Sequence, residues 1–335
     1  MSRYTAAHVN PEGPADARPT ALQVIRDEGL EGKLTGKVIV ITGSSHGIGI
    51  ETARALSATG ATLILTARDP TRAEASLTSI LEPDRASLVQ MDNASFSSTR
   101  AAATQILAKT KNKVNILINN AGIMGIEALT LTEDGHEMQF ATNHLGHFLL
   151  FQLLKPALLA SSTPDFNSRV VMVASSTHRA TTLPSSDNYN FQQGGYHSGL
   201  AYANSKLANV YMANEIDRRY GSKGLHATSV MPGAIDTDQA RYLGEKFVQQ
   251  ILTHEKVVKE LKSAEQGAAT TVLAAIGKEW EGRGGRYLED CGEAKRGEDD
   301  GDGLSKGWVK QTYDEVEEGR LWKDSLEIVG MKDDL

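Results

Sequence analysis

The chain has 335 residues, of which 40% are hydrophobic and 23% charged, and its formal net charge is −7. This composition is typical of a globular protein with a sizeable core, and it excludes intrinsic disorder and fibrous repeats. No run approaches the roughly 18 uncharged apolar residues of a membrane-spanning helix, so we expect no membrane span. The single cysteine, Cys291, excludes an internal disulfide, and without a visible signal peptide we expect a cytoplasmic location.

The negative charge is concentrated near the C-terminus. Residues 288–335 carry 15 acidic and 7 basic side chains, a net charge of −8, whereas the preceding residues are close to neutral at +1. A nucleic-acid-binding protein is expected to carry a basic stripe, and this sequence has none. We therefore expect no nucleic-acid partner, and we interpret the acidic tail mainly as a solvated surface.

The first 36 residues are polar and contain one short predicted helix, which begins after the N-cap residue Thr20 and ends at Gly29. From Lys37 onward, short β-branched runs alternate with stretches of helix length. The predicted strands are Lys37–Gly43, Ala61–Ala67, Asn115–Asn119, Arg169–Val173, Ala227–Met231 and, more weakly, Gly285–Leu288. The predicted helices are Gly47–Ala58, Ser95–Ala108, Glu133–Leu159, Gly199–Tyr220 and Ala264–Ile276.

Apolar strands that alternate with helices indicate a parallel sheet covered by helices on both faces. We therefore predict an α/β fold with a single doubly wound Rossmann-type domain over residues 37–291. Residues 1–36 form an N-terminal extension, and residues 292–335 form an acidic C-terminal extension with a last helix near Thr312–Val329. Residues 176–201 and 236–262 are expected to form loops over a substrate.

A glycine-rich turn directly follows the first predicted strand and opens the first long helix. Glycines allow the backbone to turn sharply and to approach a pyrophosphate, while the helix N-terminus offers free N–H groups. A purely conformational role for the glycines is the alternative, but the position between strand and helix favours nucleotide binding. The residues expected to contact the nucleotide are Gly43, Ser45, His46, Gly47, Ile48 and Gly49.

Arg68 lies where the second predicted strand ends, near the expected adenosine ribose. An acidic residue there would accept a hydrogen bond from a 2′-hydroxyl, whereas an arginine favours a 2′-phosphate. The neighbouring Asp69 weakens this argument, and a solvated arginine is the alternative. On this electrostatic reasoning we favour NADP(H) over NAD(H) as the cofactor.

Tyr202 and Lys206 lie one helical turn apart, so that the phenol and the ammonium share one face of a predicted helix. Tyrosine is a poor base at neutral pH because its pKa is about 10. We predict that the lysine, together with a positively charged oxidised nicotinamide, lowers the pKa of Tyr202. The spacing alone is weak evidence, since Tyr242 and Lys246 repeat it. Only Tyr202 has a serine at the end of an upstream strand, Ser175, which can orient a substrate oxygen.

Together these motifs resemble the short-chain dehydrogenase/reductase family. The motifs that carry the resemblance are Thr42–Gly49, Asn119-Asn120-Ala121-Gly122, Asn143, Ser175, Tyr202 with Lys206, and Pro232-Gly233, which follow one another over roughly residues 37–290. The segments Thr142–Leu150 and Tyr202–Asn209 resemble the retinol dehydrogenase and WW-domain oxidoreductase branch, including its fungal members. The resemblance implies a mostly parallel sheet of seven strands.

The resemblance also implies roles for individual residues. Tyr202 would be the general acid/base, Lys206 would lower its pKa and bind the nicotinamide ribose, and Ser175, rather than the adjacent Ser176, would orient the substrate. Asn143 would hold a helix distortion and a water in the proton relay. The implied cofactor contacts are Asn119, Ala121 and Gly122 near the adenosine ribose, Asp92 and Asn93 at the adenine, and Pro232, Gly233 and Thr237 at the carboxamide.

The sequence and the resemblance together predict an enzyme that interconverts a carbonyl and an alcohol by hydride transfer with NADP(H). The residues that favour a lipophilic small-molecule substrate are Ile123, Met124, Leu183, Phe191 and Tyr196, although ordinary loop packing explains them equally well. Two other functions stay open: lyase or dehydratase chemistry on the same scaffold, and a cofactor-binding sensor or scaffold without turnover.

Three further expectations concern partners, metals and the cysteine. The predicted helices Glu133–Leu159 and Gly199–Tyr220 contain more apolar residues than one buried face needs, which predicts a homodimer through them. His144 and His147 lack the acidic and cysteine neighbours of a metal site, so we expect packing histidines and no metal. Cys291 is expected to be buried and unreactive.

Overall fold

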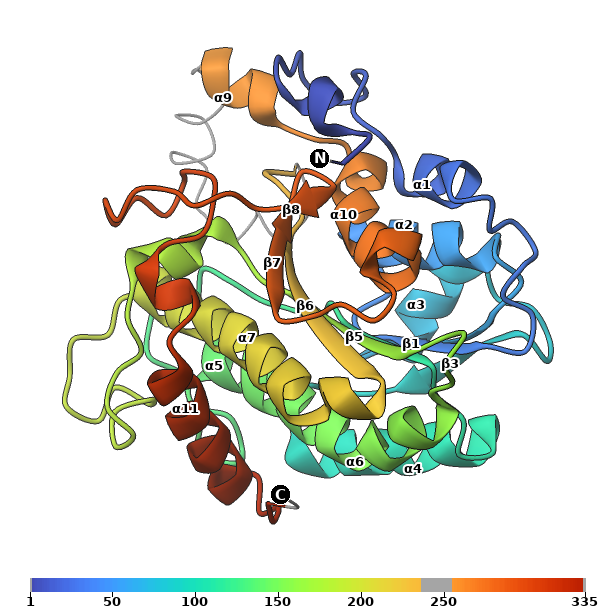
Figure 1. Ribbon diagram of the computed structural model, residues 1–335. Coiled ribbons are helices and arrows are strands. Elements are labelled where there is room, and N and C mark those ends of the chain that lie inside the picture. The colour runs from blue at the N-terminus through green and yellow to red at the C-terminus, as the bar shows by residue number, and fades with distance from the viewer. Residues whose placement is uncertain (1, 236–254, 334–335) are drawn as a thin grey trace.

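The computed structural model describes residues 2–235 and 255–333, and its centre is one eight-stranded sheet (Figure 1). Seven strands run parallel and the last, β8, is antiparallel to β7. The spatial order is β3-β2-β1-β4-β5-β6-β7-β8. The strands are β1 (Val38–Ile41), β2 (Thr62–Ala67), β3 (Ala86–Gln90), β4 (Ile116–Asn119), β5 (Ser168–Val173), β6 (Leu225–Met231), β7 (Arg286–Glu289) and β8 (Gly292–Glu293).

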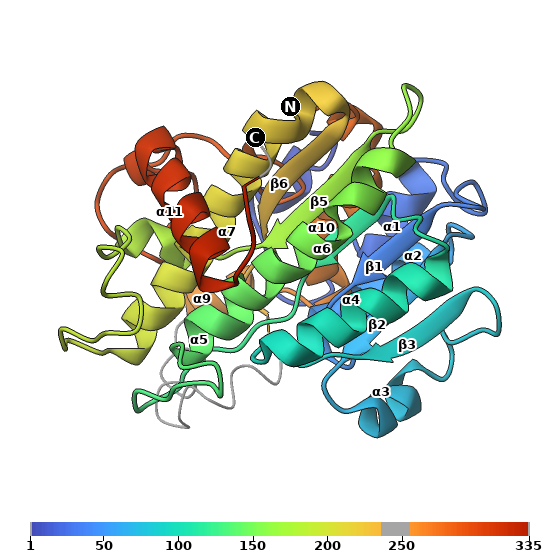
Figure 2. The ribbon, with the colours of Figure 1, turned by 90° about the horizontal axis from the view of Figure 1, so that it is seen from below.

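Both faces of the sheet are buried, which explains why the central strands β1 and β4 are apolar at nearly every position. In β1, Val38 and Val40 belong to one core cluster, whereas Ile39 and Ile41 belong to the other. Helices α4 and α6 lie side by side on the first face (Figure 2), and α2 and α10 cover the second. The bounds of the main helices are α2 (Gly47–Ser57), α3 (Pro70–Leu77), α4 (Phe96–Thr110), α6 (Gly146–Ser161), α7 (Ser198–Tyr220) and α10 (Ala264–Ile276). The predicted doubly wound α/β fold is therefore confirmed.

The sheet has eight strands, whereas seven were implied. The additional strand, β8, contains only two residues and pairs with β7 across a tight turn in which Asp290 and Cys291 take left-handed backbone angles. The strand β3 was not among the predicted strands either. This edge strand buries only Ala86 and Val89 fully, so it lacks the continuous apolar run of the central strands.

The long helix expected at Glu133–Leu159 begins later and is interrupted. Its first segment is the short helix α5 (Met138–Phe140), where the Glu137 carboxylate accepts hydrogen bonds from the first backbone N–H groups. A π-helical turn, η2 (Ala141–Leu145), follows and leads into α6. Such turns are frequent at functional sites, and this one contains Asn143.

The strand order reverses direction at the centre of the sheet, and we call the region outside the carboxyl ends of these central strands the crevice. After β1 the chain continues outward through β2 and β3, and it then returns to β4 on the other side of β1. This reversal of direction is the position at which open α/β sheets bind ligands. The glycine turn after β1 and the residues after β4 meet at this crevice.

The N-terminal extension contains the predicted helix, α1 (Ala21–Asp27), whose N-cap residue Thr20 accepts a hydrogen bond from Gln23 N. Val24 and Ile25 are completely buried in the core cluster that also includes α10. The extension thus contributes directly to the core. The boundaries of the predicted domain at residues 37 and 291 stay predictions.

The C-terminal extension forms α11 (Glu315–Ile328), which lies along α7 in both views (Figures 1 and 2). Trp322 is 2% exposed and packs edge-on against Phe148 and Phe151 of α6, with ring centroids 5.0 and 6.1 Å away. The apolar surface of α6 and α7 that predicted a homodimer is therefore covered in part by the chain's own last helix. Within the described residues, every helix is too short or too polar to cross a bilayer.

Candidate active site

The glycine turn connects β1 to α2 and is held in its conformation by close backbone contacts. Gly43 has a φ of +66°, and a Cβ on it would lie 2.7 Å from Ala121 Cα. A Cβ on Gly49 would lie only 2.2 Å from Gly43 O. Both positions therefore require glycine. Gly47, Ile48 and Gly49 form the first turn of α2, and Ser45 and His46 precede it.

The N-terminus of α2 suits an anionic ligand. His46 is the N-cap residue, but its side chain makes no capping hydrogen bond to the helix and instead contacts Ser45 Oγ at 2.9 Å. The first backbone N–H groups of α2 therefore keep the donor capacity and the positive end of the helix dipole that a pyrophosphate needs. The turn thus fits the phosphates of a dinucleotide.

Asn120, which we did not include among the expected contacts, holds the glycine turn in place. Its Nδ2 donates to Thr42 O at 2.9 Å and to Gly43 O at 3.1 Å. Asn119 has a different environment, because its side chain is completely buried and directed at Met172 Sδ. The position of Asn120 directly after a parallel strand was the signal that could have identified it.

The residues predicted to contact the adenosine half of the cofactor are Arg68, Asp92 and Asn93, which follow β2 and β3. Arg68 is exposed at the end of β2, and within residues 2–235 and 255–333 its guanidinium forms no ion pair. The neighbouring Asp69 is the N-cap of α3 and accepts a hydrogen bond from Arg72 N at 3.1 Å. Asp92 accepts from Ala94 N, and Asn93 carries a buried Nδ2 without a protein partner among the described residues. Such a buried, unpartnered donor is consistent with a ligand contact.

The π-helical turn presents Asn143 to the other side of the crevice. The Asn143 Oδ1 accepts from Ile123 N at 2.8 Å, and its Nδ2 donates to Ile123 O and to Ser205 Oγ at 2.9 Å each. Asn143 thereby joins the segment after β4 to α7. A Cβ on Gly122 would lie 3.3 Å from both Asn143 Oδ1 and Lys206 Nζ, so the absence of a side chain at this position brings these groups together.

Ser175, Tyr202 and Lys206 lie close together, as predicted. Ser175 follows β5, its hydroxyl caps the 3₁₀ helix η3 (Ser176–Ala180), and it hydrogen bonds with the Tyr202 side chain. Lys206 Nζ donates to Val173 O at 3.0 Å and lies 5.5 Å from the centroid of the Tyr202 ring. The four groups Asn143, Ser175, Tyr202 and Lys206 therefore share one end of the crevice.

In the free protein the pKa of Tyr202 is raised, and the lowering predicted for the complex with an oxidised nicotinamide stays a prediction. Burial raises the pKa of Tyr202 to about 12, and the hydrogen bond with Ser175 opposes this only in part. Lys206 directs its ammonium at Val173 O, and burial lowers the pKa of Lys206 to about 8. Desolvation of the phenolate therefore dominates the pKa of Tyr202 in the free protein. At neutral pH Tyr202 is protonated and able to donate its proton.

Pro232 and Gly233 follow β6 and lie at the same end of the sheet. Gly233 has a φ of +112°, and a Cβ on it would lie 2.7 Å from Lys262 Cδ. The backbone of this segment is thus packed directly on Lys262. The predicted contact Thr237, as well as the second pair Tyr242 and Lys246, lies outside the described residues.

The two histidines of the α6 region are packing residues, as expected. His144 and His147 are completely buried, and burial lowers their pKa values to about 3 and about 4. His147 contacts Thr42 Oγ1 and Asn143 O, while His144 contacts Ser325 of α11. In the part of the chain that the structure describes, no group of three His, Cys, Asp or Glu side chains is arranged to hold a metal. Cys291 is buried.

Comparison with known proteins agrees with this geometry. A family model described as short chain dehydrogenase matches residues 37–247, which is more than half of the chain. The chain belongs to the short-chain dehydrogenase/reductase family. Members of this family bind a nicotinamide cofactor, which the glycine turn and the crevice fit.

Several relatives are similar to this chain over more than four-fifths of its length. The short-chain dehydrogenase/reductase prx1 of Penicillium roqueforti is 46% identical, over 99% of this chain and 96% of its own. The polyprenol dehydrogenase of Mus musculus is 36% identical, over 88% and 84%. The WW domain-containing oxidoreductase of Gallus gallus is 37% identical, over 82% and 66%. A crystal structure of an uncharacterized Mycobacterium paratuberculosis protein has a TM-score of 0.67 at 28% identity and covers 90% of this chain and 96% of that one.

In this short-chain dehydrogenase/reductase, the C-terminal extension supports the segment that carries Ser175. His178 of η3 is buried and contacts both segments. Its Nδ1 lies 2.8 Å from Ser175 O, and its Nε2 lies 2.9 Å from Thr312 Oγ1 of the extension. Arg179 is 2% exposed, and its guanidinium donates to the carbonyl oxygens of Glu298, Asp302, Lys306 and Gly307. The glycine- and aspartate-rich part of the extension is thus wrapped around one buried arginine.

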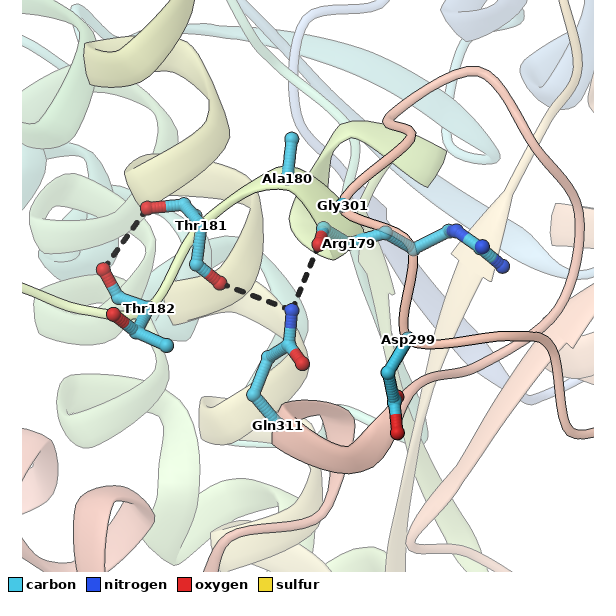
Figure 3. A pocket seen from close by; sticks show the side chains of 7 residues that line it. All are labelled: Arg179, Ala180, Thr181, Thr182, Asp299, Gly301 and Gln311. Atoms are coloured by element: carbon cyan, nitrogen blue, oxygen red, sulfur yellow. Dashed lines mark hydrogen bonds between the residues drawn. The ribbon is translucent and has the colours of Figure 1, made fainter.

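A pocket of about 260 Å³ lies between η3 and this extension (Figure 3). Gln311 spans its wall by donating to Arg179 O at 2.8 Å and to Thr181 O at 3.2 Å. The lining residues are Arg179, Ala180, Thr181, Thr182, Asp299, Gly301 and Gln311. Neither Ser175 nor Tyr202 lines this pocket, which is therefore separate from the candidate catalytic residues.

Proposed function

We propose that this protein is an NADP(H)-dependent reductase or dehydrogenase that interconverts a carbonyl and an alcohol on a lipophilic small molecule. The observation that supports this most is the convergence of Asn143, Ser175, Tyr202 and Lys206 beside the glycine turn. When bound, the nicotinamide cofactor supplies or accepts the hydride. The residues of the chain bind and orient the reactants and move the proton.

Tyr202 is the proton donor in the direction of carbonyl reduction. Its hydroxyl hydrogen bonds with Ser175, so a substrate oxygen that contacts both groups is held where it can receive the proton. Lys206 lies one helical turn away, and its charge stabilises the phenolate that remains after transfer. Asn143 keeps the backbone around the lysine in place through Ile123 and Ser205.

Three observations support NADP(H) over NAD(H). Arg68 stands at the end of β2 with a guanidinium that no described carboxylate neutralises. Asp69, the residue that made the prediction ambiguous, caps α3 with its carboxylate. Asp92, at the end of β3, accepts a hydrogen bond from Ala94 N and is therefore engaged in its own turn. A guanidinium in this position matches a 2′-phosphate.

The five apolar residues that favoured a lipophilic substrate in the sequence do not all support it equally. Leu183 belongs to the core, and Phe191 is buried against the Tyr196 ring, so both are explained by packing. Ile123 and Met124 are only partly buried after β4, close to Asn143. One relative is called a polyprenol dehydrogenase, a name that denotes a long lipophilic alcohol. We therefore propose a lipophilic ketone, aldehyde or alcohol.

The test is turnover of the purified protein with NADPH or NADH and a panel of lipophilic ketones, aldehydes and prenols. The absorbance of the reduced nicotinamide reports hydride transfer. Tyr202→Phe should lose about 10²- to 10⁴-fold in rate, the usual contribution of a general acid, while its affinity for NADPH stays unchanged. Tyr211→Phe, which removes a phenol hydroxyl from the same helix α7, should retain full activity. Equal activity of both variants would overturn the assignment.

The two other functions make different predictions in the same assay. A sensor or scaffold would bind NADPH and leave its absorbance unchanged with every substrate. A lyase or dehydratase would consume substrate without net oxidation of the cofactor. The intact set of Asn143, Ser175, Tyr202 and Lys206 favours hydride transfer, because a protein without turnover has no chemical need for all four.

The homodimer and the cytoplasmic location stay predictions. The apolar surface that favoured a homodimer is covered in part by Trp322 of α11, so a dimer through α6 and α7 would have to use the surface that α11 leaves uncovered. Sedimentation over a range of concentrations tests this: a mass that stays that of one chain removes the homodimer.

A further inference from the structure

Arg18 belongs to the N-terminal extension, yet its side chain is buried against the end of α9 (Glu255–Glu260). It is only 3% exposed. Its guanidinium donates to the carbonyl oxygens of Leu261 at 2.5 Å, Glu260 at 3.0 Å and Gly13 at 2.9 Å. Figure 1 shows the N-terminal segment beside α9. The last carbonyls of a helix lack partners within it, and the five donors of an arginine are well suited to bind several at once.

A second set of contacts fixes the extension to the start of α10. Gln266 accepts a hydrogen bond from Ala15 N at 3.0 Å and donates to Asp16 Oδ1 at 3.0 Å and to Arg18 O at 3.1 Å. The same Gln266 completes the capping box of α10 with Ser263. The N-terminal extension is therefore attached on both sides of the short segment that contains Lys262.

Lys262 is the residue that carries this attachment to the candidate active site. It is 3% exposed, its backbone N donates to Ala234 O at 2.8 Å, and its Nζ donates to Pro232 O at 3.3 Å. The side chain passes so close beneath Gly233 that a Cβ there would collide with it. Lys262 thus holds three consecutive residues, 232–234, from one side.

The ammonium of Lys262 is kept in this position by Asp290, which follows β7. Its Oδ1 is 2.8 Å from Lys262 Nζ, and its Oδ2 is 2.8 Å from Lys306 Nζ of the C-terminal extension. Separating the two groups of a buried ion pair would leave a buried charge without a partner, which is energetically costly. The ion pair with Asp290 therefore keeps Lys262 Nζ in this position. Both extensions therefore meet the sheet at the residue that supports Pro232 and Gly233.

We propose that Arg18 and Lys262 are positioning residues for the nicotinamide half of the cofactor. Arg18 holds the carbonyls of Glu260 and Leu261 in place, and because Lys262 directly follows them, its position is fixed as well. Lys262 in turn holds the Pro232–Gly233 backbone in the conformation that would bind the ligand. A segment that is ordered before binding does not lose conformational freedom when the ligand arrives, which strengthens binding. This inference rests on the proposed function, because it assumes that the crevice binds a nicotinamide dinucleotide.

A merely structural role for Arg18 and Lys262 makes a different prediction. If the two residues only stabilise the fold, their loss weakens every ligand of the crevice to the same extent. If they position residues 232–234, their loss weakens NADPH but not its adenosine bisphosphate half, which carries the 2′-phosphate and lacks the nicotinamide. The comparison of the two ligands therefore separates the two roles.

The experiment measures dissociation constants for NADPH and for this adenosine bisphosphate with the full-length protein. We expect Arg18→Met and Lys262→Met each to weaken NADPH binding by about tenfold or more, the effect of leaving buried polar groups without partners, and to leave the adenosine bisphosphate unchanged. Arg3→Met, which removes an exposed arginine of the same extension, should bind both ligands as the wild type does. Lys262→Arg should restore part of the NADPH affinity.

Each failure has a distinct meaning. Wild-type protein that binds neither NADPH nor NADH would overturn the proposed function, and this inference with it. If the wild-type protein binds NADPH, two results would overturn this inference alone. One is unchanged NADPH affinity in both methionine variants, and the other is an equal weakening of both ligands in these variants. Should Arg18→Met fail to fold, Arg18→Lys and Lys262→Met provide the same comparison.

Discussion

Thr42 and His147 are joined by a hydrogen bond of 2.8 Å between Thr42 Oγ1 and His147 Nε2. The other ring nitrogen, Nδ1, lies 2.9 Å from Asn143 O. A carbonyl can only accept, so Nδ1 carries the proton, and in the neutral ring Nε2 accepts from the threonine hydroxyl. The same hydroxyl accepts from Asn120 N and Ala121 N at 2.9 Å each. This pair therefore connects the glycine turn, the segment after β4 and the π-helical turn.

The neutral state of His147 predicts that acid destabilises the protein. Burial lowers the pKa of His147 to about 4, whereas a histidine of the unfolded chain has a pKa of about 6.5. Between these values the unfolded chain binds a proton that the native state does not, so the free energy of unfolding falls as the pH falls from about 6.5 to about 4. His147 alone contributes a loss of about 3 kcal/mol across this window.

Denaturant unfolding at several pH values measures this effect. We expect His147→Gln to show a smaller decrease of the unfolding free energy over the same window, because the titrating group is gone. His197→Gln, in which the replaced histidine is exposed, should keep the wild-type slope. An identical slope in all three proteins would assign the acid sensitivity to other groups.

Arg68→Ala should change the cofactor preference. The loss of a charge-assisted contact of about 1.5–3 kcal/mol corresponds to roughly tenfold to hundredfold weaker NADPH binding, while NADH binding stays the same. Titration of both cofactors by fluorescence gives the ratio. Arg26→Ala, which removes another exposed arginine, serves as the control. A parallel loss of both cofactors would contradict a role for Arg68 at the 2′-phosphate.

Trp322→Ala should destabilise the protein by about 3–5 kcal/mol, because a large side chain is removed from a closely packed aromatic cluster with Phe148 and Phe151. Val316 lies on the same helix and is 79% exposed, so Val316→Ala should have little effect. Thermal and denaturant unfolding of both variants provide the comparison. Similar stability of the two variants would show that α11 does not contribute to the core in solution.

The two directions of the proposed reaction should respond differently to pH. Carbonyl reduction needs a protonated Tyr202, which the raised pKa of about 12 ensures at neutral pH. Alcohol oxidation needs a proton acceptor, so its rate should rise from about pH 7 to about pH 10. Initial rates in both directions with one substrate pair test this. A pH-independent oxidation rate would argue against a phenolate as the acceptor.

The sequence by itself determined the central strands of the sheet and singled out the residues of the candidate active site. The strands β1, β4 and β5 are apolar at nearly every position because both of their faces are buried, and this signal is local and readable. The Tyr202–Lys206 spacing and the glycine turn are also local, since their geometry depends on residues within one or two helical turns. The edge strand β3 escaped detection because only part of it is buried.

Only the tertiary structure decided what the extensions contact and how Tyr202 is protonated in the free protein. The contacts of Arg18 with Glu260 and of Trp322 with Phe148 join residues that are far apart in the chain, and no local pattern encodes such pairs. The raised pKa of Tyr202 in the free protein has the same origin. A lysine one turn away can be read from the sequence, but the desolvation that raises this pKa depends on every segment packed around the phenol.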